Sequence, residues 1–452
     1  MGCRHAMPAV AGLLISVLLS VPVLRAQQQP VLSGEARSEV SSMMQDAYNE
    51  VKKHYYDPKL HGLDWDARYK QYSARIANAH DLGEGFRTVA AFLSGLKDSH
   101  TFFVPPTRTS HLDTGYRYAL VGNACYITQL RPKSDAASKL HIGDQVLGIN
   151  GFSVDRDDFH DVRYFFDILA PQMSYTLDLR SPAGEQRRVV VNAATRPSSK
   201  FVDLTEGSSY YDMVRRDQDE DHTMRDRVVE SGDATIWKLQ QFYFDYDDVT
   251  DYRREDDYAH VDKVIGIARK HKTLILDLRG NHGGAVDTLK LIVGALFDHD
   301  IKICDRVGKS AMKPMIAKPL ARRFDGKLIV LVDGSSASAA ELLARVVQLE
   351  HRGTVIGDKT SGAVMEAMFH SEALGADTKI FYGFSVTDAN LMMSDGKSLE
   401  NTGVVPDELL MPTGADLAAG SDPVLVRAAE LGGVKLDPVE AGKMFPYEWM
   451  PL

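Results

Sequence analysis

Residues 327–341 read KLIVLVDGSSASAAE, and this stretch decides the class of fold. Its first six residues are almost all apolar and mostly branched, which is typical of a β-strand buried on both faces. A turn through Asp333 and Gly334 follows, and the residues from about Ser338 to Leu349 are predicted to form a helix. A buried strand that turns directly into a helix indicates an α/β protein with a parallel sheet.

The same pattern occurs on both sides of this stretch. Residues 273–284, TLILDLRGNHGG, predict a buried strand that ends in a glycine-rich turn, and a helix is predicted over about 285–297. A third strand is predicted over 354–356. Strands joined by crossover helices imply a largely parallel sheet, whose functional sites collect at the carboxyl ends of the strands. Both glycine-containing turns lie at such ends.

Upstream of these strands the pattern changes twice. Helical spacing of apolar residues over about 33–80 and 83–96 predicts an amino-terminal helical region. Short strands and turns are predicted from about 115 to 193, with a hairpin around 181–184. Within them, residues 140–151, LHIGDQVLGING, mix apolar and polar residues at strand spacing and end in an Asn-Gly turn.

Length and charge limit the classes of function. The chain has 452 residues, 44% of them hydrophobic, which predicts two or three domains. Its formal net charge of −10 offers no basic footprint, so we predict no nucleic-acid partner. The charged runs at 215–221 and 253–257 are predicted to be solvated surface or loop.

The first residues have the pattern of a signal peptide. Arg4 precedes an apolar run over about 9–23, and small Ala26 suits the last position before cleavage. The run is shorter than the roughly 20 residues of a transmembrane helix, so we predict export and no stable membrane span after cleavage. An uncleaved anchor is the alternative. Cys125 and Cys304 would remain in the mature chain, as one disulfide or as two buried thiols.

Three groups of residues could carry chemistry. Ser338 begins a helix, where backbone N–H groups and the helix dipole can stabilise an oxyanion, although Ser338 with Glu341 is also a capping box that needs no catalysis. The glycines of the 281–284 turn let backbone approach a ligand closely. Ser99-His100 and Glu400 are each unremarkable in isolation.

The motifs, taken together and in order, resemble the carboxy-terminal processing (tail-specific) proteases and their tricorn-core relatives. The resemblance covers roughly Glu84 to Asp407. The motifs that carry it are DSHT at 98–101, LDLRGNHGG at 276–284, SASAAE at 336–341, IGDKTSG at 356–362 and LENTGVVPD at 399–407.

A second resemblance concerns the region between the first two of these motifs. Residues 140–151 are similar to the late strand of a PDZ domain, which commonly reads Gly-Asp, an aliphatic pair and Asn-Gly. This implies a PDZ-like domain that binds an extended peptide tail by strand addition. A small β-barrel without a ligand is the alternative.

The family resemblance implies roles for single residues. Ser338 would be the nucleophile, and the N–H groups of Gly284 and Ala339 would form the oxyanion hole, with Gly283 as the alternative to Gly284. Typical tail-specific proteases have a lysine base at the position of Ala363 here.

The missing lysine indicates which branch of the family the chain resembles. The tricorn-like branch uses a histidine base, an acid and a serine beside the histidine, and His100, Glu400 and Ser99 match these. A histidine is a suitable base near neutral pH, whereas a lysine must first be desolvated. Lys359 is the other candidate base, although it lies on the wrong side of Thr360.

The predicted fold is therefore α/β and multidomain, with a largely parallel-sheet protease core, a helical amino-terminal region and an inserted PDZ-like β domain. The expected parts are a signal peptide at 1–26, the helical region at 27–114, the PDZ-like domain at 115–195, the catalytic core at 196–415 and a carboxy-terminal tail at 416–452.

The predicted function is a secreted serine endopeptidase with a Ser-His-Glu triad, acting on a peptide or unfolded protein. No metal or organic cofactor is predicted, because His282 and His351 lack metal-ligand spacing. Two alternatives are a catalytically inactive peptide- or ligand-binding relative and an esterase, although the Gly-x-Ser-x-Gly elbow of many esterases is absent around Ser338.

Overall fold

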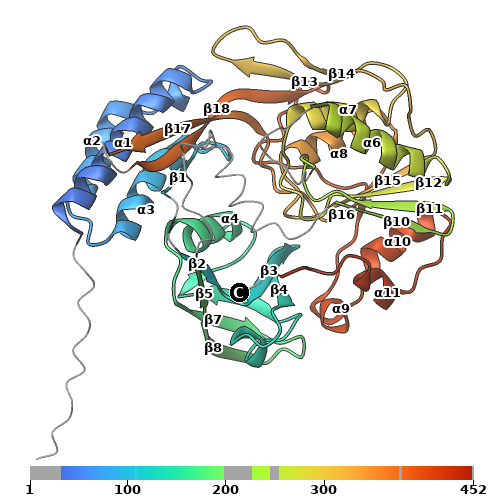
Figure 1. Cartoon of the computed structure of the whole chain (residues 1–452), viewed down its shortest axis with the longest axis horizontal. Coiled ribbons are helices and arrows are strands. Elements are labelled where there is room, and N and C mark those ends of the chain that lie inside the picture. The colour runs from blue at the N-terminus through green and yellow to red at the C-terminus, as the bar shows by residue number, and fades with distance from the viewer. Residues whose placement is uncertain are drawn as a thin grey trace, which may run out of the picture.

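The structure is a computed structural model, which describes residues 32–106, 108, 110–197, 226–244, 254–375 and 379–449. The predicted signal peptide of residues 1–26 and the charged run at 215–221 lie outside these residues. Figure 1 shows a group of amino-terminal helices, a β-rich module and an α/β core. None of the helices in the described ranges has the length and apolar character needed to cross a membrane.

The core contains a mixed sheet with the strand order β10-β11-β12-β15-β16-β19. β10 and β11 pair antiparallel, and all the other neighbours in this order pair parallel, so the predicted largely parallel sheet is confirmed. The strands are β10 (Arg227–Ser231), β11 (Ala234–Lys238), β12 (Thr273–Asp277), β15 (Lys327–Val332), β16 (Gly353–Gly357) and β19 (Glu408–Leu409).

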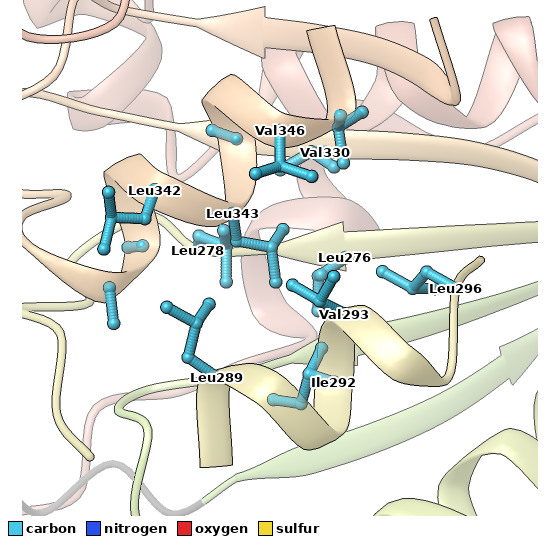
Figure 2. Packing of buried hydrophobic residues seen from close by; sticks show 14 of the residues in the cluster. Leu276, Leu278, Leu289, Ile292, Val293, Leu296, Val330, Leu342, Leu343 and Val346 are labelled. Carbon is cyan, nitrogen blue, oxygen red and sulfur yellow. The ribbon is translucent and has the colours of Figure 1, made fainter. Parts of the chain in front are cut away.

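Helices cover both faces of this sheet. Alternate residues of a strand point to opposite faces, so Leu274 and Leu276 pack with one helical layer and Ile275 with the other. Figure 2 shows Leu276 among side chains of α7 and α8. The first layer has α6 (Arg254–Ala268), α7 (Val286–Gly294) and α8 (Ala339–Leu349), and α10 (Pro423–Leu431) and α11 (Pro438–Lys443) supply the second. Part of the predicted tail at 416–452 thus packs on the sheet.

A second, antiparallel sheet joins the amino-terminal helices to the core, and the sequence pattern did not predict it. β1 pairs with β18, β18 with β13 and β17, and β13 with β14. Phe103 of β1 and Phe384 of β18 stack at the centre of the cluster beneath α1 and α3. The strands are β1 (Phe102–Val104), β13 (Ile301–Gly308), β14 (Met315–Ala317), β17 (Met365–Leu374) and β18 (Ile380–Met393), and the helices are α1 (Gly34–His54), α2 (Trp65–Ile76) and α3 (Leu82–Leu93).

The β-rich module has its own buried core, which includes Phe159, Leu177 and Leu179. Its predicted hairpin is confirmed, since β7 and β8 pair antiparallel across the turn at 181–185. The elements are β3 (Tyr116–Val121), β4 (Ala124–Leu130), β5 (Gln145–Ile149), β6 (Phe152–Ser153), α4 (Phe159–Arg163), β7 (Ser174–Arg180) and β8 (Gln186–Asn192); β2 (Ser110–Asp113) and β9 (Ala194–Pro197) pair beside it, and α9 (Gly414–Ala419) follows β19.

The structure decides between the two expectations for the cysteines. Cys125 and Cys304 are both free and buried, so the two-thiol alternative is correct, and burial raises the pKa of each thiol to about 12.

The prediction that 253–257 is wholly solvated is wrong at Asp257. Asp257 is buried on α6 and accepts a hydrogen bond of 2.5 Å from the Thr288 hydroxyl, which compensates for its burial.

Candidate active site

The turn between β15 and α8 contains three serines, which differ in exposure. Ser335 and Ser336 are buried, and the Ser336 hydroxyl donates to the carbonyl of Leu278 at 2.8 Å. Ser338 is only half-buried. Of the three, it is therefore the serine whose side chain a substrate can reach most easily.

Ser338 has a backbone conformation that side chains other than glycine rarely adopt. Its φ is 55° and its ψ is −117°, so the turn stores strain. Its N–H donates to the carbonyl of Ala363 at 2.8 Å and to Oε2 of Glu341 at 3.1 Å. In strained strand-to-helix turns of this kind the side chain is presented at the end of the sheet.

Glu341 connects this turn to the segment after β16. Its carboxylate accepts hydrogen bonds from the N–H groups of Ser338, Gly362 and Ala363 and from the Thr360 hydroxyl. Burial raises the pKa of Glu341 to about 7, against the opposing effect of these donors. The capping contact with Ser338 is therefore present together with a half-exposed hydroxyl, so the two interpretations of this segment do not exclude each other.

The glycine turn after β12 lies directly against the turn that carries Ser338. A Cβ atom on Gly283 would lie 2.7 Å from the Ser338 Cβ, so only glycine fits. The Gly283 N–H donates to Asn281 Oδ1 at 2.8 Å. Across the described ranges, no acceptor is assigned to the N–H of Gly284 or Ala339. This difference favours Gly284 over Gly283 as the donor to an oxyanion.

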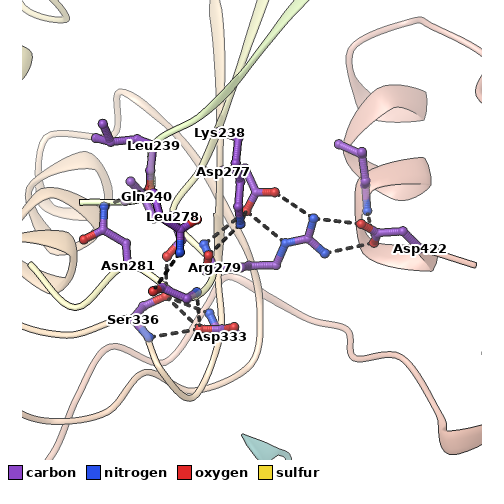
Figure 3. Close-up of polar contacts among 12 residues, drawn as sticks. Lys238, Leu239, Gln240, Asp277, Leu278, Arg279, Asn281, Asp333, Ser336 and Asp422 are labelled. Carbon is purple, nitrogen blue, oxygen red and sulfur yellow. Dashed lines mark hydrogen bonds and ion pairs between the residues drawn. The ribbon is translucent and has the colours of Figure 1, made fainter. Parts of the chain in front are cut away.

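Further hydrogen bonds join the two turns. The carbonyl of Asn281 accepts from Ala337 N–H at 2.9 Å, and Gly280 N–H donates to Asp333 Oδ1 at 3.0 Å. The same Asp333 oxygen accepts from Ser336 N–H at 2.9 Å, and Figure 3 shows Asp333 beside Ser336. The two turns therefore behave as one unit.

A charged cluster holds the end of β12 behind this unit. Arg279 binds both carboxylate oxygens of Asp277 and both oxygens of Asp422, the residue that caps α10 (Figure 3). Lys238 donates to the Arg279 carbonyl at 2.6 Å. Burial would raise the pKa of Asp277, but the Arg279 and Lys238 charges lower it well below its usual range. The cluster anchors the glycine turn to α10.

His100 reaches the site on the loop between α3 and β1, and Asp98 shapes that loop. Asp98 Oδ1 accepts from His100 N–H at 3.0 Å, from Thr101 N–H at 2.7 Å and from the Thr387 hydroxyl at 2.6 Å. Asp98 Oδ2 accepts from the Tyr55 hydroxyl at 2.8 Å. The sequence indicates no role for Asp98 or Thr387, because their contact joins positions that lie far apart in the chain.

The four predicted side chains form one continuous series of contacts. His100 Nε2 lies 3.4 Å from Ser338 Oγ. His100 Nδ1 lies 2.7 Å from Ser99 Oγ, which donates to Glu400 Oε2 at 2.9 Å. Glu400 Oε1 accepts from Ser99 N–H at 2.7 Å. The acid therefore contacts the histidine through Ser99 rather than directly.

This series determines which nitrogen of His100 carries a proton. The Ser99 hydroxyl has one hydrogen, which it donates to Glu400, so it can only accept from His100 Nδ1–H. Nε2 then has a free lone pair directed at the Ser338 hydroxyl. This is the tautomer that a general base requires.

Burial shifts the pKa values of the two titratable groups in opposite directions. It lowers the pKa of His100 to about 4, although the Asp98 charge opposes this. Burial raises the pKa of the Glu400 carboxyl above its usual value, against the hydrogen bonds that it accepts from Val364 N–H and Ser99. At neutral pH, His100 is therefore an unprotonated base.

The segment at 362–364 contacts both halves of the site. The Ala363 carbonyl accepts from Ser338 N–H at 2.8 Å, and Val364 N–H donates to Glu400 Oε2 at 2.8 Å. Lys359, the other candidate base, is exposed and has no assigned contact with Ser338 in the described structure.

The β-rich module contacts the chain just before this segment. Arg156 binds Asp358 at 2.6 Å and the Lys359 carbonyl at 3.1 Å. His160 Nε2 lies 3.0 Å from the Ser361 hydroxyl. The module thus borders the site without supplying any of the four side chains in the series.

Comparisons with known proteins match the chain to peptidases. Residues 243–410 match the model of peptidase family S41, and residues 36–84 match the tricorn protease C1 domain. A carboxyl-terminal-processing protease of Picosynechococcus is 22% identical over 88% of this chain and 89% of its own length. A tail-specific protease of Haemophilus influenzae is 23% identical over 59% of this chain, but this covers only 36% of that protein.

A solved structure has the same fold. Mature CPAF aligns with a TM-score of 0.62 at 15% identity, covering 85% of this chain and 94% of that one. The match over residues 243–410 and the curated relatives make the chain similar to the serine-type peptidases of family S41. The chain carries a peptidase family S41 domain and a tricorn protease C1 domain, and it is related to the carboxyl-terminal processing and tail-specific proteases.

Proposed function

We propose that the chain is a serine endopeptidase in which Ser338, His100 and Glu400 form a catalytic triad assisted by Ser99. The single observation that supports it is the unbroken series of contacts from Ser338 Oγ to Glu400. The 3.4 Å separation between Ser338 and His100 is long for a hydrogen bond, as is common in resting enzymes, and should shorten when substrate binds.

The proposed mechanism uses each of these contacts. His100 Nε2 takes the proton of Ser338 as Oγ attacks the peptide carbonyl, and later gives it to the leaving amine. The imidazolium that forms donates through Nδ1 to Ser99, whose hydroxyl transmits the stabilising charge of Glu400. Water then attacks the acyl-enzyme by the same route, which returns Ser338 to its starting form.

The oxyanion of each tetrahedral intermediate would accept hydrogen bonds from Gly284 N–H and Ala339 N–H. Ala339 is the first residue of α8, so the helix dipole adds to its donor. The bond between Gly283 N–H and Asn281 supports the choice of Gly284, since that N–H is already engaged.

Three further parts of the proposal concern the rest of the chain. The β-rich module is proposed to be PDZ-like and to engage a peptide or unfolded protein substrate. The pattern of the first 26 residues supports export through a signal peptide. The expected domain limits at 27–114, 115–195, 196–415 and 416–452 remain predictions.

A fluorophosphonate probe, which labels an activated serine, tests the proposal. Wild-type protein should be labelled, and Ser338→Ala should abolish the labelling. Ser335→Ala is the matched control, because Ser335 lies in the same turn but outside the series of contacts. The same samples should cleave an unfolded protein substrate in parallel with the labelling.

Three outcomes would contradict the proposal. Labelling that persists in Ser338→Ala would assign the reactive serine elsewhere. A folded wild-type protein that neither reacts with the probe nor cleaves unfolded substrates would favour the inactive ligand-binding relative. Hydrolysis of simple esters without peptide cleavage would favour an esterase.

A further inference from the structure

A cluster of potential metal ligands lies between α1 and β17, away from the four side chains of the proposed catalytic series. Glu50 Oε2 lies 3.5 Å from His54 Nε2 and 3.1 Å from His370 Nδ1. The three ligand atoms all lie within 4.8 Å of one another. Glu50 and His54 are one helical turn apart on α1, so both side chains face the strand.

The side chains converge without being paired by ordinary hydrogen bonds. Although one Glu50 oxygen approaches both imidazoles, no hydrogen bond is assigned among the three side chains in the described part of the chain. The other ring nitrogen of His370, Nε2, is buried, and within the same ranges it has no partner. Of the two ring nitrogens of His370, Nδ1 is therefore the one that faces Glu50.

The chemistry of this cluster fits a particular class of ion. Two imidazoles and one carboxylate form a common three-residue ligand set for Zn²⁺, with a fourth position left for water or another group. The exposed fractions of the side chains are 14% for Glu50, 19% for His370 and 32% for His54, so an ion can enter a site that is already largely desolvated.

We propose that Glu50, His54 and His370 bind one divalent transition-metal ion of the Zn²⁺ type. Glu372 is a candidate for the fourth ligand, because it lies two residues beyond His370 on the same face of β17. The proposal differs from the sequence-based expectation of no metal, since His54 and His370 are too far apart in the chain to form a recognisable motif.

Binding requires one local change. The two imidazole rings are stacked, with centroids 4.1 Å apart and an angle of 25° between their planes. An ion bound in the plane of both rings needs a larger angle, so the stack must open as the ion enters. His54 ends α1 and is the more exposed of the two, so its ring is the one with room to rotate.

The ion would fasten the end of α1 to β17 next to the proposed catalytic loop. His54 is the last residue of α1, and the following residue, Tyr55, donates to Asp98, which binds His100 N–H. We therefore assign the ion a structural role in holding this end of α1, without any contact with substrate. This inference does not depend on the proposed peptidase activity.

The test uses full-length mature protein, stripped with a chelator and titrated with Zn²⁺ and with Co²⁺. We expect one equivalent of Zn²⁺ to remain after gel filtration, a Co²⁺ spectrum of nitrogen and oxygen ligation, and a rise in Tm on adding Zn²⁺. Glu50→Gln and His370→Asn should each weaken binding by at least about 100-fold, because each removes a direct ligand.

The controls separate this cluster from other histidines. His351→Asn alters an exposed histidine with a φ of 50°, a conformation that asparagine tolerates, and should retain binding. Ser338→Ala and His100→Asn should also retain it, so failure of the peptidase proposal and failure of this one are distinguishable. Glu50→Gln nearly preserves side-chain shape, which keeps the test valid if His370→Asn does not fold.

Three results would overturn the proposal. The first is retention of well under one equivalent of Zn²⁺ by wild-type protein after gel filtration. The second is binding that survives unchanged in Glu50→Gln and His370→Asn. Loss of tight binding in His100→Asn, with the three proposed ligands intact, would assign the ion to the other site.

Discussion

The turn that carries Ser338 and the loop that carries His100 are built in opposite ways. The turn continues a buried strand into a helix, and Glu341, three residues ahead, binds its backbone. The loop is held by residues that are distant in sequence: the Asp98–Thr387 bond spans 289 positions and the Ser99–Glu400 bond spans 301. One half of the site is therefore local, and the other is assembled by tertiary structure.

This difference predicts which substitutions affect folding and which affect mainly activity. The turn shares its hydrogen bonds with the core of the sheet, so a change there should affect both folding and activity. In the loop, Ser99 is exposed and His100 half-buried, so changes there should affect activity far more than folding.

Replacing either reacting side chain should have the largest effect. Ser338→Ala and His100→Ala should each lower kcat/KM by about 10⁵-fold or more, and the double variant should lose little beyond that, because triad members act as a unit. Peptide cleavage by the three variants, measured against wild type, checks this. Losses that multiply in the double variant would mean that the two halves do not share one reaction.

Glu400, the acid that binds the His100 loop, should matter for catalysis and little for folding. Glu400→Gln should lower kcat by about 10⁴-fold, because it removes the charge that stabilises the imidazolium, while the shape of the side chain is preserved. Kinetics and thermal unfolding of the same sample check this. A drop in Tm large enough to explain the loss of activity by unfolding would place Glu400 with the structural residues instead.

Glu341, the acid that binds the Ser338 turn, should matter for folding as well as for activity. Glu341→Ala leaves buried donors on Ser338, Thr360, Gly362 and Ala363 without their acceptor and should lower the free energy of unfolding by about 3 kcal/mol. Urea unfolding checks this, with Glu440→Ala in an exposed ion pair as the matched control. Near-wild-type stability of Glu341→Ala would remove the contrast between the two acids.

The pH dependence should report the burial of His100. Its pKa falls from 6.5 to about 4, so the neutral base persists to lower pH and the acid limb of kcat/KM should lie near pH 4. In the unfolded chain His100 takes up a proton near pH 6.5, whereas in the folded chain it does so only near pH 4. His100 therefore makes the fold less stable as the pH falls from 6.5 toward 4. His100→Asn should remove this part of the pH dependence in urea unfolding. An acid limb near 6.5 would contradict the buried environment.

The smallest expected effect concerns the alternative base. Lys359→Ala should leave kcat/KM within about two-fold of wild type, because its side chain is exposed and lies outside the series of contacts. Peptide cleavage across neutral and alkaline pH checks this. Complete loss of activity would transfer the role of base from His100 to Lys359.

Local patterns in the sequence predicted much of this molecule. The branched apolar runs at 273–278 and 327–332 indicated buried parallel strands, and the glycines and small residues after them indicated the turns at the ends of the strands. Ser338 could be selected because strand, turn and helix are consecutive there. Motif order then selected His100, Ser99 and Glu400, whose contacts no local pattern could have indicated.

The tertiary structure alone decided three features. The antiparallel sheet through β13 and β18 sets the position of the His100 loop, since Thr387 of β18 binds Asp98. The positive φ of Ser338 is held by the carbonyl of Ala363, which follows β16 in the chain. The burial that lowers the pKa of His100 requires the packed chain. Strand and helix periodicity depend on neighbours in sequence, whereas these features depend on contacts between residues that meet only when the chain folds.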